Sequence, residues 1–121
     1  DGSIGFDLVS FQNESGKHGT NPEQLFAMGY AACFDSAMNH VAPTLGLKPT
    51  TSSTTVGVGI GQKPDGAFGL DFDITITVAG LSEEDARKLI TRAHEVCPYS
   101  NATRGNVDVR LHVNVIQSFD L

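Results

Sequence analysis

Apolar and polar residues alternate in several regions of this chain, and each region predicts a strand. Residues 56–60 and 70–78 place apolar side chains at every second position, a period that indicates a strand with one buried face. Residues 63–66, Lys-Pro-Asp-Gly, have the composition of a turn, so the two strands are predicted to form a hairpin. Residues 107–115 repeat the alternation and predict a final strand, and looser alternation over residues 4–11 predicts an initial one.

Two further segments carry the apolar spacing of helices. Asn21 is a suitable N-cap, Pro22 suits the first helical position, and apolar residues then follow on nearly every side of the predicted helix. This long helix is expected to lie inside the protein and to stop by Gly46. A second helix begins with a capping box at Ser82 and carries a buried stripe over residues 86–97.

The end of the second helix is set by Pro98, because a proline disfavours the helical conformation in the residue before it. Residues 100–106 are predicted to form a polar loop, as are residues 13–19. Strands and helices therefore mix along the chain, and the predicted fold class is α+β. No repeat, low-complexity segment or linker divides the chain, so residues 1–121 are expected to form a single domain.

Length and charge exclude several classes of function. The 121 residues are 40% hydrophobic, which is enough for one core, and a second copy of so short a chain could supply further burial. A net charge of −6 leaves no basic face for nucleic acid, and the longest apolar run, residues 25–34, is about half the length that crosses a bilayer. No secretion signal opens the chain and two cysteines are too few for a disulfide scaffold, so the cytoplasm is the expected location.

Cys33 lies in the middle of the first predicted helix, and its chemistry depends on its surroundings. A thiol in an apolar helix is commonly an inert core residue. To act as a nucleophile it needs a nearby cation that lowers its pKa, yet the segment from His18 to Leu47 contains no lysine or arginine. Such a cation must come from elsewhere in the fold. Glu23 would then fit as the carboxylate that orients an arginine, although the helix dipole alone also favours a first-turn glutamate.

Cys97 is predicted at a helix C-terminus, where the helix dipole disfavours a thiolate. It is therefore the poorer nucleophile of the two cysteines and suits a resolving role. Attack of Cys33 on a peroxide O–O bond would leave a sulfenic acid, which condenses with a second thiol to form a disulfide. The alternative is that Cys97 only packs beneath the first helix, because spacing in sequence does not show that two sulfurs meet.

The histidines offer two competing interpretations. His94 precedes Cys97 by three residues, which allows either half of a metal site or a Cys-His pair for acyl transfer. A zinc site needs about four ligands in compact spacing. The remaining histidines are instead scattered along the chain: His18, His40 and His112. We therefore expect no metal and no cofactor.

Two stretches are specific enough to indicate a family. The first is Gly-Thr-Asn-Pro-Glu-Gln-Leu-Phe-Ala at residues 19–27, followed by Gly-Tyr-Ala-Ala-Cys-Phe at residues 29–34. The second is Val-Cys-Pro-Tyr-Ser-Asn-Ala-Thr-Arg-Gly-Asn at residues 96–106. Both closely resemble the organic hydroperoxide resistance proteins (Ohr), within the wider family of osmotically inducible protein C (OsmC). The likeness runs over nearly the whole chain, and the second stretch resembles the hydroperoxide branch in particular.

The resemblance implies both a fold and an activity. The fold would be an intertwined homodimer with antiparallel sheets and a long buried central helix, and the active sites would lie near the subunit interface. The activity would be that of a thiol-dependent peroxidase that reduces alkyl or fatty-acid hydroperoxides to alcohols. Cys33 would be the peroxidatic cysteine and Cys97 the resolving one, with their disulfide recycled by dihydrolipoyl groups on protein partners. Glu23 would form an ion pair with a catalytic arginine that activates Cys33.

The catalytic arginine is the point at which this sequence departs from the family pattern. In the family it lies in an N-terminal segment that precedes the position of Asp1. The arginines of this chain do not match it by motif: Arg87, Arg92, Arg104 and Arg110. The domain is therefore expected to lack the family's first strand, or to have it ahead of Asp1. If the protein consists of these residues alone, we expect slow peroxide turnover, because the thiolate would lack its cation.

The preferred substrate and two rival functions remain open at this point. Apolar residues near Cys33 favour an organic hydroperoxide over hydrogen peroxide, although they serve equally well as core. These residues are Leu25, Phe26, Met28, Tyr30 and Phe34. A redox-sensing or binding dimer would use the cysteines without turnover, and the missing arginine would favour it. A Cys-His hydrolase would use Cys33 with a distant histidine, but no motif supports it.

Overall fold

The computed structural model describes residues 21–116; the predicted strand over residues 4–11, the loop over residues 13–19 and His18 lie outside the described residues. The described sheet contains β1 (Thr51–Gln62), β2 (Phe68–Ala79) and β3 (Val109–Ile116). The described helices are α1 (Pro22–Val41), α2 (Glu83–Val96), α3 (Pro98–Thr103) and the short 3-10 helix η1 (Pro43–Leu45). The predicted α+β class is confirmed.

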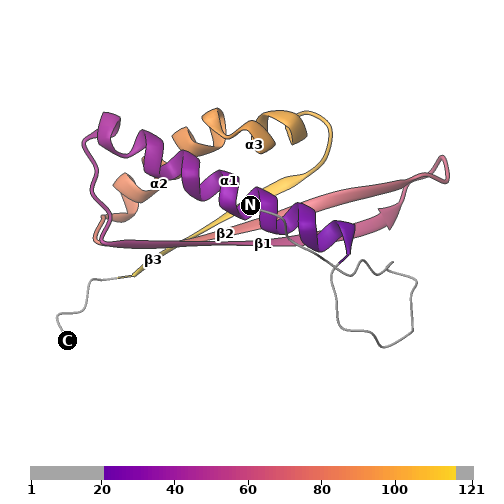
Figure 1. Ribbon diagram of the computed structural model, residues 1–121, viewed down its shortest axis with the longest axis horizontal. Helices are drawn as coiled ribbons and strands as arrows, with labels where there is room; N and C mark the ends of the chain where they lie inside the picture. The colour runs from indigo at the N-terminus through magenta and orange to yellow at the C-terminus, as the bar shows by residue number, and fades with distance from the viewer. Residues whose placement is uncertain (1–20, 117–121) are drawn as a thin grey trace, which may run out of the picture.

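The helices α1, α2 and α3 lie on one side of the sheet (Figure 1). β2 is the central strand, and it buries every second side chain against the helices: Phe72, Ile74, Ile76 and Val78. Tyr30 and Phe34 of α1 and Leu89 of α2 complete the centre of this core, and each is fully buried. The alternation along β2 therefore faces the helices as its period of two predicts.

The sheet is mixed, which corrects the expectation of antiparallel sheets. β1 and β2 form the predicted hairpin, with Val58 opposite Phe72 and Val56 opposite Ile74. β3 instead runs parallel to β2 along its other edge. The physical reason is the connection between them: α2 and α3 carry the chain back along the sheet before β3 begins, and such a crossover produces a parallel pair.

α1 begins and ends as the sequence predicts, but the described residues do not enclose it. The Asn21 Oδ1 atom accepts a hydrogen bond from the Gln24 N–H at 2.8 Å, and Gly46, with φ of 72°, follows η1 in the left-handed region. One face of α1 packs on the sheet, whereas Met28 on another face is 53% exposed. A single sheet covers only one face of a helix, however apolar the others are. None of the described helices is long and apolar enough to cross a membrane.

α2 confirms one prediction, and the residues after it correct another. The Ser82 Oγ atom accepts a hydrogen bond from the Asp85 N–H at 3.1 Å, as the predicted cap requires. Pro98 ends α2 but also opens α3, so residues 98–103 are helical and the predicted polar loop over residues 100–106 is wrong for its first part. Proline suits the first position of a helix because its missing N–H would have no partner there.

Candidate functional site

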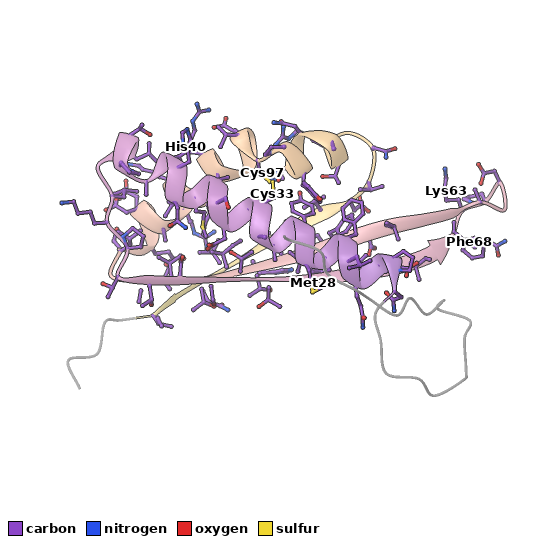
Figure 2. All side chains as sticks on the ribbon, in the orientation of Figure 1. Met28, Cys33, His40, Lys63, Phe68 and Cys97 are labelled. Atoms are coloured by element: carbon purple, nitrogen blue, oxygen red, sulfur yellow. The ribbon has the colours of Figure 1, made fainter. Side chains whose placement is uncertain are left out.

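The structure brings the two cysteines together. Cys33 lies in the middle of α1, Cys97 lies at the junction of α2 and α3, and their Sγ atoms are 3.1 Å apart (Figure 2). Both are free thiols; Cys97 is fully buried and Cys33 is partly exposed. Whether the two sulfurs meet was open from the sequence, and in the structure they do. Cys33 is the thiol that a reagent from solution reaches first.

The surroundings of Cys33 disfavour its thiolate. Burial raises the pKa of the Cys33 thiol above its ordinary range, and the neighbouring Cys97 thiol raises that pKa further. The backbone N–H of Tyr99 donates to Cys33 Sγ and lowers the pKa in part. No cation among the described residues contributes to this shift. A nucleophilic Cys33 at neutral pH therefore requires a positive charge that residues 21–116 do not provide.

Close contact between α1 and α3 places Tyr99 beside Cys33. Gly29 lies one turn before Cys33 on α1, and a Cβ atom at this position would lie 2.9 Å from the Tyr99 hydroxyl oxygen. The absence of a side chain at Gly29 thus leaves room for the Tyr99 ring. α3 can then lie near enough to α1 for the Tyr99 N–H to reach the Cys33 sulfur.

A buried hydrogen-bond network holds the Cys97 segment against α1. The Tyr30 hydroxyl lies 2.8 Å from Ser100 Oγ and 3.2 Å from Thr103 Oγ1. Ser100 Oγ also lies 2.8 Å from His94 Nδ1, so the network joins α1, α2 and α3. Tyr30 and Ser100 are fully buried. Sequence reasoning treated Tyr30 only as an apolar residue, either near the substrate or in the core. The available signal was its hydroxyl, because a buried tyrosine needs a hydrogen-bond partner.

His94 is occupied by this network. Burial lowers the pKa of His94, and the charge of Arg104 lowers it further, which favours the neutral imidazole. Arg104 donates hydrogen bonds to the His94 carbonyl oxygen and, at 2.6 Å, to Asn101 Oδ1. The structure thus gives His94 a hydrogen bond to Ser100, whereas the sequence had left a metal site or a Cys-His pair as alternatives for it. Across residues 21–116, no three His, Cys, Asp or Glu side chains are grouped to hold a metal ion.

Glu23 lies far from Cys33 within one chain. The two residues are ten positions apart on α1, which corresponds to about 15 Å along a helix axis. Its Oε2 atom is buried and has no hydrogen-bond partner among the described residues. A buried carboxylate oxygen requires a donor, so Glu23 is poised to accept a hydrogen bond from a group outside residues 21–116.

A cavity of about 510 Å³ opens beside Cys33, between α1 and α2. Its wall consists of Cys33, Ser36, Ala37, His40, Val41, Thr44, Arg92, Val96 and Pro98. The residues that the sequence suggested as apolar neighbours of Cys33 do not line it, and Tyr30 and Phe34 are buried in the core. A cavity of this size and mixed lining suits a small organic ligand.

Comparison with known proteins shows the family of the chain. The family model described as OsmC-like protein matches residues 14–112. The chain belongs to the OsmC family. This OsmC-family chain is 54% identical over 98 residues to an organic hydroperoxide resistance protein of Xanthomonas axonopodis pv. citri, which covers 80% of the chain and 68% of that relative. It is 42% identical over 114 residues to the organic hydroperoxide resistance protein OhrB of Bacillus subtilis, covering 93% of the chain and 84% of OhrB.

Solved structures of OsmC-family proteins share its fold. The crystal structure of Bacillus subtilis OhrB matches with a TM-score of 0.84 at 43% identity, covering 90% of this chain and 82% of that one. The structure of an organic hydroperoxide resistance protein from Legionella pneumophila matches with a TM-score of 0.79 at 48% identity, covering 83% of this chain and 73% of the Legionella chain. The family that the sequence resemblance implied is therefore confirmed.

Proposed function

We propose that this chain is a thiol peroxidase that reduces organic hydroperoxides to alcohols. The observation that carries the proposal is the 3.1 Å separation of the Cys33 and Cys97 sulfurs beside a cavity that Cys33 lines. The relatives named organic hydroperoxide resistance proteins supply the substrate class. Metal and cofactor have no step in this chemistry, because the two thiols carry both electrons.

The proposed cycle has three steps. The Cys33 thiolate attacks the terminal oxygen of the hydroperoxide, the O–O bond breaks, and the alkoxide takes up a proton and leaves as an alcohol. Cys33 is then a sulfenic acid, and the Cys97 sulfur displaces its hydroxyl group as water to form the Cys33–Cys97 disulfide. An external dithiol, which we propose to be a dihydrolipoyl group on a protein partner, transfers two electrons and restores both thiols.

The burial of the two cysteines supports this division of roles. Cys33 is partly exposed and receives the Tyr99 N–H, which stabilises negative charge on its sulfur. Cys97 is fully buried and lies at the end of α2, so it is shielded from peroxide but adjacent to Cys33. With the sulfurs already close, disulfide formation needs little movement of the Cys97 segment. Rapid resolution would protect Cys33 from over-oxidation.

We further propose that Glu23 acts in a homodimer. Its buried, unpartnered Oε2 atom supports a role as the acceptor for a catalytic arginine. Because Glu23 and Cys33 of one chain are about 15 Å apart along α1, one arginine cannot contact both. The Glu23 carboxylate of a second subunit would instead complete each active site.

Steady-state turnover tests the proposed function. The assay follows reduction of cumene hydroperoxide with dihydrolipoamide, comparing the wild type with Cys33→Ser and Cys97→Ser. We expect the wild type to turn over and Cys33→Ser to be inactive. Cys97→Ser is expected to complete one oxidation of Cys33 and then either to stop, although dihydrolipoamide is present, or to over-oxidise. Equal turnover in the wild type and Cys33→Ser would refute the peroxidase proposal.

A second candidate is a redox sensor without turnover, which the adjacent pair of thiols also fits, because redox-sensing cysteines often lie next to a resolving cysteine. A sensor consumes one equivalent of peroxide per site and then stops, whatever dithiol is present. Counting the equivalents of hydroperoxide consumed in the same assay separates the two functions, because a peroxidase consumes many.

A further inference from the structure

The cavity beside Cys33 follows one stripe of α1. Cys33, Ala37 and Val41 recur every four residues, and Ser36 and His40 fill the neighbouring positions of the same stripe. The facing wall comes from the last two turns of α2, where Arg92 and Val96 are also four residues apart. The cavity is therefore an elongated groove between two helices, with the reactive thiol at one end.

The basic residues of this groove, His40 and Arg92, lie away from Cys33, whereas Ser36 lies within one turn of it. His40 lies seven residues after Cys33, about 10 Å along α1, and Figure 2 shows it toward the C-terminal end of that helix. Arg92 lies five residues before Cys97, about 8 Å back along α2. Along the helices, Ala37 lies between Cys33 and His40, and Val96 lies between Arg92 and Cys97, while Val41 lines the groove just beyond His40. The groove thus runs from a thiol, across an apolar wall, to a cation.

Arg92 can exchange its present partner for an anionic ligand. Its guanidinium pairs with Glu95 at 3.3 Å, and both side chains are more than half exposed. An exposed pair of this kind contributes little to stability, so a ligand carboxylate can replace Glu95 at small cost. No carboxylate is among the described residues that line the groove. A planar guanidinium also matches a carboxylate in a two-bond geometry.

We propose that Arg92, assisted by His40, binds the carboxylate of an acidic organic hydroperoxide. The apolar wall would hold the carbon chain and direct the O–O group toward Cys33. This inference rests on the proposed peroxidase function and adds to it a preference for substrates with a free acid group over their neutral esters. It also makes Arg92 a specificity-determining residue distinct from the arginine that would activate Cys33.

Turnover of a matched pair of substrates tests this preference. The probes are a fatty-acid hydroperoxide and its methyl ester, with the acid-to-ester ratio of kcat/KM as the readout. Arg87→Gln is the matched control, because Arg87 is an exposed arginine on α2 that pairs with Glu83 at 2.9 Å and does not line the groove. We expect Arg92→Gln to lower the ratio about tenfold, the size of one hydrogen bond to a charged group, and Arg87→Gln to leave it unchanged. An unchanged ratio in Arg92→Gln would overturn the proposal.

A binding experiment tests the same site without turnover. Octanoate is added to the reduced protein, and alkylation of Cys33 by iodoacetamide is followed by peptide mass spectrometry, with octanol as the neutral probe. We expect octanoate to slow alkylation in the wild type and in Arg87→Gln, and to lose most of this protection in Arg92→Gln. Equal protection by octanoate in all three proteins, or protection in none of them, would refute the proposed carboxylate-binding site at Arg92, here called the acid site.

The two experiments separate the failure of each proposal. Protection by octanoate through Arg92 with no turnover of any hydroperoxide would retain the acid site and reject the peroxidase function. Turnover of cumene hydroperoxide with an acid-to-ester ratio that does not respond to Arg92→Gln would retain the peroxidase and reject the acid site.

Discussion

At Cys33, opposing effects on one sulfur set its reactivity. Burial and the Cys97 thiol disfavour the thiolate, and the Tyr99 N–H favours it without outweighing them. Because only the thiolate is alkylated, the rate of reaction with iodoacetamide reports its population at each pH. For a protein of these 121 residues, we expect this rate to rise with pH and to reach its midpoint above about 8.5, the value of a free cysteine. A midpoint below neutrality would instead show that a cation within the chain acts on Cys33.

The Tyr30 hydroxyl is a second residue whose contribution can be measured. Tyr30→Phe removes its hydrogen bonds to Ser100 and Thr103 in a fully buried site. We expect the free energy of unfolding, measured with urea, to fall by about 1–2 kcal/mol. Tyr99→Phe is the matched control, because Tyr99 is 39% exposed. We expect this variant to lose no more than about 0.5 kcal/mol of the free energy of unfolding. Equal losses in the two variants would mean that the buried network does not stabilise the Cys97 segment.

Single residues differ in how far the sequence reveals them. The two cysteines could be identified as candidate site residues, because a thiol has few chemical roles. The sequence did not show whether their sulfurs lie in contact. The partnership of Tyr30 and Ser100 was not identifiable, because seventy residues separate them and the contact exists only once α3 docks on α1. Arg92 was compared with the family's activating arginine and did not match it by motif, and no other role for its side chain was predicted. Its position in a groove beside Cys33 depends on the packing of two helices, which no local pattern encodes.

Among the elements, local signals predicted the beginnings of helices and the hairpin, whereas direction and packing came from the whole chain. The Asn21 and Ser82 caps and the alternation of β2 depend only on residues that are close together in the sequence, and each is found in the structure. The parallel direction of β3 follows from the crossover through α2 and α3, which lies outside any strand. α3 was missed because Pro98 serves as the end of one helix and the start of the next.

The packing of α2 against α3 should make stability depend on pH through His94. Its folded-state pKa is lowered by burial and by Arg104, so below about pH 6.5 the unfolded chain binds a proton that the folded chain resists. Stability therefore falls as the pH is lowered through this range and is fully retained above it. We expect the free energy of unfolding to drop less between pH 7.5 and 5.5 in His94→Gln than in the wild type. His40→Gln, which removes an exposed histidine, serves as the control, and identical pH profiles for wild type and His94→Gln would contradict the role of His94.

At the scale of the whole molecule, the described chain leaves large apolar side chains uncovered. These include Met28 at 53% exposure and Phe68 at 58%. Met28 lies on α1 and Phe68 on β2, at separate positions in Figure 2. Apolar residues that are exposed singly are common on protein surfaces, so the proposed homodimer rests on Glu23 and not on these two residues. A second copy would also bring another Glu23 into reach of Cys33, which the same chain cannot do.

Mixed dimers test whether Glu23 acts across the proposed interface. One subunit carries Glu23→Gln and the other Cys33→Ser, and co-expression with two different tags allows the heterodimer to be purified. If Glu23 of one subunit serves Cys33 of the other, the heterodimer contains one intact site of two and retains about half of the wild-type peroxidase activity. If Glu23 serves its own chain, the only remaining Cys33 lies in the subunit with the altered Glu23. The heterodimer would then be no more active than the Glu23→Gln homodimer, and a site completed across the interface would be excluded. The expectation of activity in trans rests on the geometry of α1, since about 15 Å of helix separates the two residues within one subunit.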